Sequence, residues 1–365
     1  MALRHLHRLP LRLPPSPSPS GPSPSTALLS TATSTTASAL LSLLSPPLLA
    51  DARAEYLATG YAHIPGFLPP HEVASLAAEC ASLRGGAFLS TESHTAYQEE
   101  PDRSLPPSHP RNHLLASSKS IVDFARLPPA SLLRALYARD AFRELVQHVV
   151  YGDDSGYGDS DGGGDGDRDG GRDGGRDGGE HQGTGNDERS NQRIFPSACA
   201  FNGAYYNVFE AGDQLGWHFD RSEFGVNLVL QSAVAGGEFQ YDHNTRRSDT
   251  KRSDTQRSDT QRSDTDTEQW AYDRVGAILK GTLDPPPPVA EGVGPGSLVI
   301  FSGRESLHQV TPVGEGTRMN AIFTFEKEAG ARPNSYSLQK FFGRTAEEQG
   351  ASNAASSMNE PVESK

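Results

Sequence analysis

The stretch YNVFEAGDQLGWHFD, from Tyr206 to Asp220, predicts the fold of this chain. Two short runs of aromatic and β-branched residues flank a Gly-Asp turn, which is the pattern of neighbouring β-strands. Because side chains alternate between the two faces of a strand, His218 and Asp220 share one face, and Trp217 and Phe219 share the other. The His-x-Asp pair could therefore bind one ion. On this stretch alone, two polar residues that share a strand face without a ligand remain the alternative.

Further strand-like runs follow residue 191, namely ACAFNGAYYNVF, FGVNLVLQ, GEFQYD, GSLVIFSG, HQVTPV and RMNAIFTFE. Short strands with glycine turns and no intervening helices predict an antiparallel sandwich or barrel. Residues 51–151 differ, because PPHEVASLAAECASLR and PASLLRALYARDAFRELVQHVV have helical spacing. A long polar loop at 91–115 separates them, and we expect its histidines to pack the loop rather than contact a substrate. The whole pattern predicts a mainly β fold with an N-terminal helical region.

Composition divides the 365 residues into one folded part and four atypical segments. Residues 1–50 lack Asp and Glu and combine arginines with Ser, Thr, Pro and Ala, which is typical of a mitochondrial or chloroplast transit peptide; a disordered tail is the alternative. Residues 152–190 are almost only Gly, Asp and Arg, and residues 246–268 repeat RSDT, so we expect two disordered insertions. With a disordered tail at 346–365, one domain remains at 51–345.

The charge of the chain is concentrated in one insertion. Residues 152–190 contain ten Asp, two Glu and four Arg, and so carry eight of the thirteen net negative charges. The remainder is only mildly acidic and has no basic run interleaved with aromatics, so we expect no nucleic-acid partner. ALLSLLSPPLLA is too short and too broken by proline to span a bilayer, so we expect no membrane partner. Two cysteines, Cys80 and Cys199, favour a reducing compartment. The oligomeric state stays open.

Two residues of the β region extend the His-x-Asp pair. His308, in SLHQV, is a candidate third ligand. Two histidines and one carboxylate make the facial triad that leaves coordination positions open on non-haem Fe(II). Arg318 follows ten residues later, at the start of the last clear strand. A buried guanidinium there could receive a carboxylate in a bidentate, charge-assisted pair.

With His-x-Asp, a distal His and an Arg about ten residues later, the chain resembles the iron(II)/2-oxoglutarate-dependent dioxygenases of the jelly-roll type. The resemblance is strongest over residues 205–325. AYQEEPDRSLPPSHPRNHLL, HFDRSEF and FSGRESLHQVTPV are similar to a mostly bacterial subgroup that includes oxygenases and halogenases of free amino acids. The resemblance implies a double-stranded β-helix with flanking helices. It also implies Fe(II), 2-oxoglutarate and O2 as cofactors, with ascorbate as reductant.

The resemblance implies a role for each matching residue. His218, Asp220 and His308 would hold the iron, and Arg318 would hold the distal carboxylate of 2-oxoglutarate. Further cosubstrate contacts would come from Asn207, Asn320 and Tyr205. Phe209 departs from the pattern, because many relatives have a tyrosine there, and the missing hydroxyl would have to come from elsewhere, for instance from Tyr205.

The implied activity is hydroxylation of an unactivated C–H bond of a small molecule, with a free amino acid as one candidate and with release of succinate and CO2. Asp220 favours hydroxylation, because halogenating relatives have Gly or Ala at that position. One alternative is a protein-residue hydroxylase of the prolyl type. Another is a non-catalytic jelly-roll protein that binds a metal or a small ligand. Arg318 argues against the second, because a purely structural metal site needs no carboxylate receptor.

Overall fold

The computed structural model describes most of the chain after residue 45. The described residues are 46–152, 193–243, 245–246, 264–283 and 293–349. Most of the predicted transit peptide, of both predicted insertions and of the predicted C-terminal tail lies outside these residues. Those predictions therefore stay untested over the segments that the structure does not describe.

Helices occupy the N-terminal part and two later positions in the described chain. The helices are α2 (Pro46–Thr59), α3 (Pro70–Leu83), α4 (Leu132–Tyr137), α5 (Asp140–Tyr151), α6 (Asp264–Leu279) and α7 (Ser335–Ser337), and α7 runs into the π-helical segment η5 (Leu338–Phe342). Single 3-10 turns are η1 (Arg84–Gly86), η2 (Pro110–Asn112) and η3 (Phe124–Arg126).

Strands make up the rest of the ordered framework. They are β1 (Tyr61–Ile64), β2 (Phe88–Ser90), β3 (His94–Thr95), β4 (Leu114–Leu115), β5 (Ser117–Val122), β6 (Phe195–Pro196), β7 (Ala204–Phe209), β8 (Gln214–His218), β9 (Phe224–Gln231), β10 (Ala235–Gly236), β11 (Phe239–Asp242), β12 (Leu298–Phe301), β13 (Leu307–Val310), β14 (Val313–Glu315) and β15 (Arg318–Glu326).

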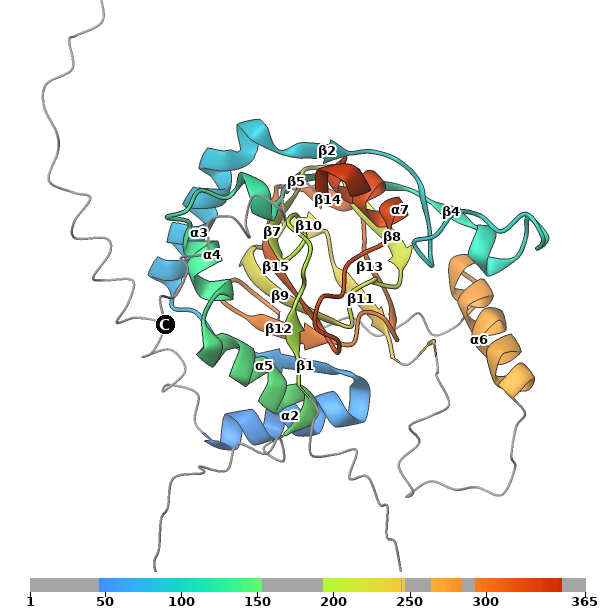
Figure 1. The fold of residues 1–365 in the computed structure, drawn as a ribbon, viewed down its shortest axis with the longest axis horizontal. Helices are drawn as coiled ribbons and strands as arrows, with labels where there is room; N and C mark the ends of the chain where they lie inside the picture. Colours follow the sequence, from blue (N-terminus) through green and yellow to red (C-terminus); the bar gives the residue numbers. More distant parts are fainter. Residues whose placement is uncertain (1–45, 153–192, 244, 247–263, 284–292, 350–365) are drawn as a thin grey trace, which may run out of the picture.

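An 11-stranded antiparallel sheet follows the order β1-β12-β9-β15-β7-β5-β8-β13-β11, with β2 and β6 paired beside β5 and β15. Strand β5 connects the two halves, because Ser120–Val122 pair with β7 whereas Ser117 and Ser118 pair with β8. The sheet curls around a common interior, with helices α2 to α5 on one side and α6 on the other (Figure 1). This arrangement confirms the predicted jelly roll with flanking helices.

Side-chain alternation on the strands separates an outer core from an inner cavity wall. On β15, Phe323 and Phe325 point outward and pack against Phe142 of α5, with the Phe142 and Phe323 ring centroids 4.8 Å apart. Arg318 and Asn320 lie at even positions of the same strand and therefore point inward. Burial of one such aromatic side chain stabilises the fold by about 1.5–3 kcal/mol. The helices thus hold the sheet from outside and leave its inner face to the site.

Glu79 of α3 ties the helical layer to the sheet. Its carboxylate accepts hydrogen bonds from the Tyr206 hydroxyl on β7 at 2.8 Å and from the Ser131 hydroxyl at 2.6 Å. It also accepts the backbone N–H of Leu132, the first residue of α4, at 2.7 Å. One side chain thereby fixes α3, α4 and β7 to each other.

The structure corrects two helix predictions. The run from residue 129 to 150 is two helices rather than one, because Arg139 adopts an extended conformation (φ −82°, ψ 127°) between α4 and α5. Helix α6 interrupts the β region, where we expected no helix. Its Val275 and Ile278 pack against Trp217 of β8 and against Phe219, which follows the end of that strand. This tertiary contact gives the segment a buried face.

Three predicted boundaries also shift. Helix α2 begins at Pro46, within the segment 1–50 that we assigned to a transit peptide. Helix α6 begins at Asp264, within the predicted insertion 246–268. Residues 346–349 are helical, although we placed them in a disordered tail. In each case, the folded part reaches a few residues further than composition indicated.

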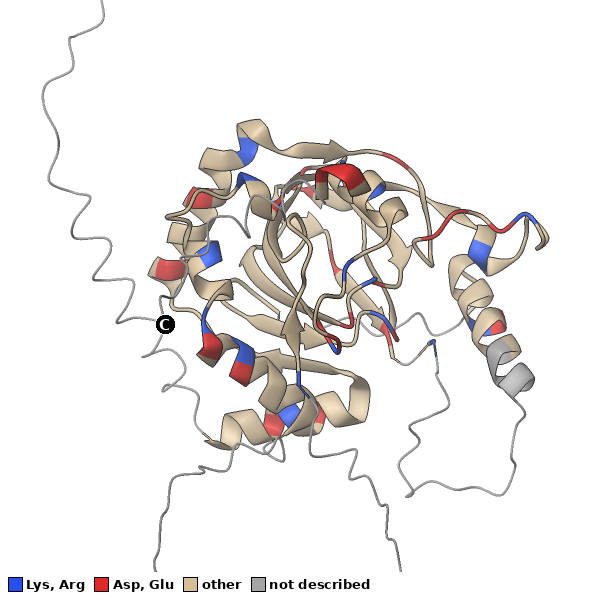
Figure 2. Ribbon diagram, in the orientation of Figure 1, with Lys and Arg blue, Asp and Glu red and all other residues tan. Residues whose placement is uncertain are grey.

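Acidic and basic residues stand side by side along the helices of the outer layer (Figure 2). Helix α2 carries Asp51, Arg53 and Glu55, and α5 carries Asp140 and Arg143. Among the described residues, no helix is both long and apolar enough to cross a membrane.

Candidate metal centre

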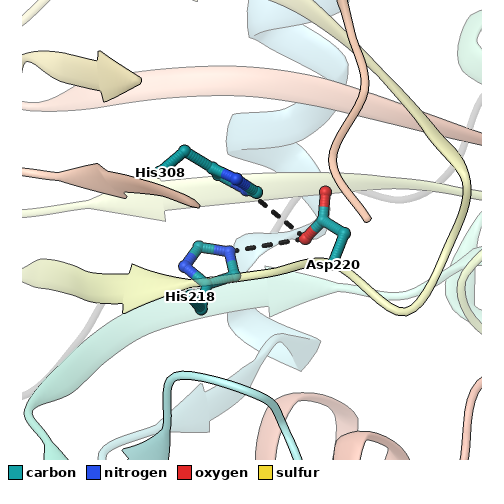
Figure 3. Close-up of side chains that lie close together, drawn as sticks. All are labelled: His218, Asp220 and His308. Carbon is teal, nitrogen blue, oxygen red and sulfur yellow. Dashed lines mark ion pairs between the residues drawn. The ribbon is translucent and has the colours of Figure 1, made fainter. Parts of the chain in front are cut away.

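His218, Asp220 and His308 meet at one point of the inner wall (Figure 3). Strands β8 and β13 are antiparallel neighbours in which His218 and His308 are direct register partners. Asp220 follows the end of β8, and its backbone N–H donates to the Gly303 carbonyl at 2.9 Å. One potential ligand atom from each of the three side chains lies within 4.8 Å of the others. The structure therefore brings together the triad that the sequence predicted.

The two imidazoles are held in one tautomer. The Nδ1 atoms of His218 and His308 lie 2.8 Å and 2.9 Å from the carbonyl oxygens of Gly216 and Ser306. Because a carbonyl oxygen only accepts, each Nδ1 must carry the proton. Each Nε2 then keeps its lone pair, and the two Nε2 atoms lie 3.4 Å and 3.5 Å from the same Asp220 Oδ1. Backbone acceptors that orient ligating histidines in this way are typical of metal sites.

Electrostatics favour the ligating forms of His218 and Asp220. Burial, reinforced by His308, lowers the pKa of His218 to about 4, so the imidazole is neutral at pH 7. Burial raises the pKa of Asp220, but His308 and His218 outweigh this effect and hold the pKa below its usual range. The histidine side chains are 4% exposed and the Asp220 side chain 27%. Two neutral imidazoles and one carboxylate fit a divalent metal such as Fe(II).

Gly303 provides the space for the Asp220 carboxylate. A Cβ atom at this position would lie 2.4 Å from Asp220 Oδ2 and 2.9 Å from Asp220 Cβ. No real Cβ atom tolerates such contacts, so any larger residue would move the carboxylate. Sequence reasoning did not identify Gly303, because this contact exists only in three dimensions.

The triad lines a cavity that is partly open to solvent. Of the residues predicted to bind the cosubstrate, Tyr205, Asn207 and Asn320 line it. Arg318 is buried; its Nη1 donates to the Gly237 carbonyl at 3.1 Å, and its Nε has no partner among the described residues. Three of the four residues thus line the cavity, and Arg318 lies on the same face of β15 as Asn320.

Two asparagines form a polar patch on this wall. Asn207 of β7 and Asn320 of β15 are direct register partners. The Nδ2 of Asn320 donates to Asn227 Oδ1 at 2.9 Å. The Oδ1 atoms of Asn207 and Asn320 are buried without a partner among the described residues. Buried amides with open hydrogen-bonding capacity are suited to a polar ligand.

Lys119 is a cavity residue that sequence reasoning missed. It lies on β5, is 4% exposed and lines the same cavity as the triad. Its Nζ is 5.9 Å from the ring centroid of Phe209 and 5.4 Å from that of Phe341. The sequence pattern that could have identified it is SSKSIV, in which the lysine stands two residues before Ile121. Residues two apart on a strand share a face, so Lys119 shares the face of this buried apolar residue.

The long loop at 91–115 packs beside the site and reaches the cavity at Gln98. The ring of His94 is buried and lies 5.7 Å from the ring of His218. His109 packs against Tyr272 of α6 at 4.6 Å. His94 and His109 therefore pack within or beside the loop, as expected; the same expectation for His113 stays a prediction. The loop also carries Glu99, which pairs with Arg221 at the cavity wall at 2.8 Å.

Gln98 is a strained residue where this loop reaches the cavity. Its φ of 52° lies in the left-handed region, which non-glycine residues rarely adopt. The Ser337 hydroxyl donates to Gln98 Oε1 at 2.9 Å, and Asn334 Nδ2 donates to the Gln98 carbonyl at 3.0 Å. These contacts from the C-terminal α7 region hold the loop in place beside the cavity.

Comparison with known protein families gives no matching family profile, and no curated protein matches the chain. Solved structures with some likeness include an oxidoreductase of the 2OG-Fe(II) oxygenase family from Burkholderia pseudomallei, with 13% identity, coverage of 78% of this chain and 92% of that chain, and a TM-score of 0.42. A Pseudomonas putida prolyl-4-hydroxylase has 15% identity, coverage of 77% of this chain and 100% of that chain, and a TM-score of 0.39. HygX from Streptomyces hygroscopicus, solved with nickel and 2-oxoglutarate bound, has 14% identity, coverage of 76% of this chain and 87% of that chain, and a TM-score of 0.40.

Proposed function

We propose that this chain is an Fe(II)- and 2-oxoglutarate-dependent dioxygenase that hydroxylates an unactivated C–H bond of a small molecule. The observation that carries the proposal is the convergence of His218, Asp220 and His308 at the wall of a cavity, with both Nε2 atoms directed at one carboxylate oxygen. A facial set of two histidines and one carboxylate leaves coordination positions open for a chelating cosubstrate and for O2. The jelly-roll frame supports the same function, because it presents the triad on its inner face.

Iron bound by these three residues would supply the oxidising chemistry, in which 2-oxoglutarate and O2 are converted to succinate and CO2 and one oxygen atom is inserted into a substrate C–H bond. The contribution of the chain is to bind and orient the reactants. Ascorbate would serve as the reductant that keeps the iron in the Fe(II) state.

Four residues of β7 and β15 are assigned to the cosubstrate in this proposal. The Arg318 guanidinium would bind the distal carboxylate of 2-oxoglutarate. Burial lowers the pKa of Arg318, but the side chain remains a cation at neutral pH and so attracts an anion. Asn207 and Asn320 would contact the cosubstrate through their side-chain N–H groups, because the Oδ1 atoms that lack a partner among the described residues only accept and cannot bind a carboxylate. Tyr205 lines the cavity beside them. Apolar walls around these groups exclude water and so strengthen each charged contact.

The substrate side of the cavity has polar and charged groups near Asp220. Arg221, Ser222 and Gln98 line it there. This mixture suits a small polar molecule, and a free amino acid is the candidate that we propose first. Asp220 itself favours hydroxylation over halogenation, because the carboxylate occupies a metal position that a halide would need.

A succinate-release screen tests the proposed function. Purified protein with Fe(II), ascorbate and air would be offered free amino acids and short peptides, and Asp220→Asn would serve as the matched control with the same side-chain size. We expect succinate above background with a free amino acid and none with the control. Turnover with a peptide alone would favour a protein-residue hydroxylase of the prolyl type. No succinate with any compound would favour a non-catalytic metal-binding jelly roll.

We further propose that the acid-free N-terminal segment directs the protein to a mitochondrion or a chloroplast. The test is a fusion of residues 1–45, which precede α2, to a fluorescent protein. Fluorescence confined to the cytosol would contradict this proposal.

A further inference from the structure

Arg221 is a charged cavity residue to which the proposed function assigns no specific contact. It follows Asp220 directly, in the connection between β8 and β9, and lines the cavity that contains the triad. Its Nη1 donates to Glu99 Oε1 at 2.8 Å, and within the part of the chain that the structure describes this is the only partner of the guanidinium. A guanidinium has five N–H groups, so most of them stay available to a ligand.

Glu99 does not use up the positive charge beside it, because two arginines share its carboxylate. Its Oε2 accepts a hydrogen bond from Arg111 Nη2 at 2.6 Å. Burial raises the pKa of Glu99, but the hydrogen bonds from Arg111 and Arg221 outweigh this effect and hold the pKa below its usual range. Glu99 is therefore ionised at neutral pH. One carboxylate balances one of the two guanidinium groups, and the trio keeps a surplus positive charge.

The backbone on both sides of the Glu99–Arg221 ion pair is fixed. The Thr95 hydroxyl donates to the Glu99 carbonyl at 2.7 Å, and the Glu99 backbone N–H donates to Thr95 Oγ1 at 3.1 Å. The Arg221 carbonyl accepts a hydrogen bond from Arg304, whose Nε lies 3.0 Å from Glu223 Oε2. A guanidinium that is already held in place loses little conformational freedom when a ligand binds, which favours affinity.

The cavity lining indicates the charge of the group that Arg221 can bind. Among the described residues of this lining, Asp220 is the only acidic one, and the proposed function commits it to the metal. The lining therefore has no further carboxylate that could pair with an ammonium group of a substrate. Arg221 also belongs to neither β7 nor β15, the strands that carry the residues assigned to 2-oxoglutarate. A planar carboxylate of another molecule matches the guanidinium fork.

We propose that Arg221 binds a carboxylate of the substrate, so that the site selects carboxylic acids over their uncharged or cationic counterparts. The inference rests on the proposed function and narrows its substrate class. A free amino acid is then recognised through its carboxylate rather than through its ammonium group. In this arrangement Glu99 holds the guanidinium at the cavity wall, and Arg111 offsets the negative charge of Glu99.

A comparison of acids with their primary amides tests this proposal, because the amide has nearly the size of the carboxylate but lacks its charge. Free amino acids and simple monocarboxylic acids, each with its amide, would be offered with Fe(II), 2-oxoglutarate, ascorbate and air, and succinate release would give kcat/KM. We expect the best acid to exceed its amide by about 10-fold, the low end for a charge-assisted contact, because the Arg221 side chain is 24% exposed. Equal values, a preference for amides or no turnover of any acid would overturn the proposal.

Variants assign the preference to one side chain. Arg221→Gln should abolish the preference for the acid, and Arg221→Lys, which keeps the charge, should retain part of it. The acid-to-amide ratio is insensitive to a damaged fold, because such damage lowers both rates together. Arg111→Gln is the matched control, since Arg111 binds the same Glu99 carboxylate but is not part of the cavity lining, and it should keep the wild-type ratio. An unchanged ratio in Arg221→Gln, or an equal fall in Arg111→Gln, would reassign Arg221 to structure.

Equilibrium binding separates this proposal from the proposed function. Protein loaded with Mn(II) under nitrogen would be titrated calorimetrically with 2-oxoglutarate and then with the best acid of the panel. Arg221→Gln should bind 2-oxoglutarate as the wild type does and the acid about 10-fold more weakly. If the wild type binds no 2-oxoglutarate, the proposed function fails. If it binds 2-oxoglutarate and both proteins bind the acid equally, only the role of Arg221 fails.

Discussion

Substitution of Gly303 by alanine should damage the metal centre without replacing a ligand. The added Cβ would lie 2.4 Å from Asp220 Oδ2, whereas ordinary van der Waals contact begins at 3.4 Å. The carboxylate must therefore retreat by about 1 Å, a displacement of the kind that can cost about 100-fold in a catalytic rate. The Cβ of Asp220 is also too close, at 2.9 Å, so rotation of the carboxylate alone gives no relief.

In the wild-type structure, Asp220 Oδ1 lies 3.4 Å from His218 Nε2 and 3.5 Å from His308 Nε2. The displacement in Gly303→Ala would lengthen both distances. Changes to groups that orient metal ligands typically cost about 10- to 100-fold in metal affinity, and we expect a loss of this size for Gly303→Ala. Calorimetric titration with Fe(II) under nitrogen measures it. Gly85→Ala is the matched control, because a Cβ there meets nothing within 4 Å. Wild-type affinity in Gly303→Ala, with an unchanged melting temperature, would refute the assigned position of the carboxylate.

Three further changes give distinct expectations. Arg318→Ala should raise the KM for 2-oxoglutarate about 10- to 100-fold through loss of a charged contact worth about 1.5–3 kcal/mol, with Arg318→Lys intermediate; steady-state kinetics with an unchanged KM would reassign Arg318 to structure. Glu79→Ala leaves three donors without their acceptor and should lower the free energy of unfolding, measured by urea denaturation, by about 1–3 kcal/mol. Glu144→Ala, at an exposed glutamate, is the control, and an equal loss in both variants would contradict the bridging role of Glu79. Replacement of residues 247–263 by a short Gly-Ser linker should leave turnover and melting temperature nearly unchanged, because the RSDT repeats contain no apolar side chain; loss of the fold would show that the repeats pack.

The sequence predicted the triad because its geometry depends on local rules. His218 and Asp220 share a face through the two-residue alternation of a strand, and this holds in any antiparallel sheet. His308 can join this pair only if its strand lies beside the strand of His218, and β13 does pair with β8. Glycine turns between short apolar runs were enough to predict an antiparallel sandwich or barrel, and the jelly roll was implied by the family resemblance.

Contacts that depend on tertiary packing were not predictable in this way. Gly303 approaches Asp220 from a different turn of the chain, and no sequence pattern joins the two residues. Helix α6 had a signal, since Ala271, Val275 and Ile278 lie at helical spacing, but the neighbouring repeats concealed it. Lys119 reaches the cavity because β5 joins the two halves of the sheet, a connection that the sequence does not show.

The most direct test of the central claim is the iron content of three variants. The purified chain, reconstituted with Fe(II) under nitrogen and freed of unbound metal, should hold one iron per wild-type molecule. His218→Ala, Asp220→Ala and His308→Ala should each hold almost none while keeping the circular dichroism spectrum of the wild type. Stoichiometric iron in all three folded variants would contradict the metal centre and the function proposed from it.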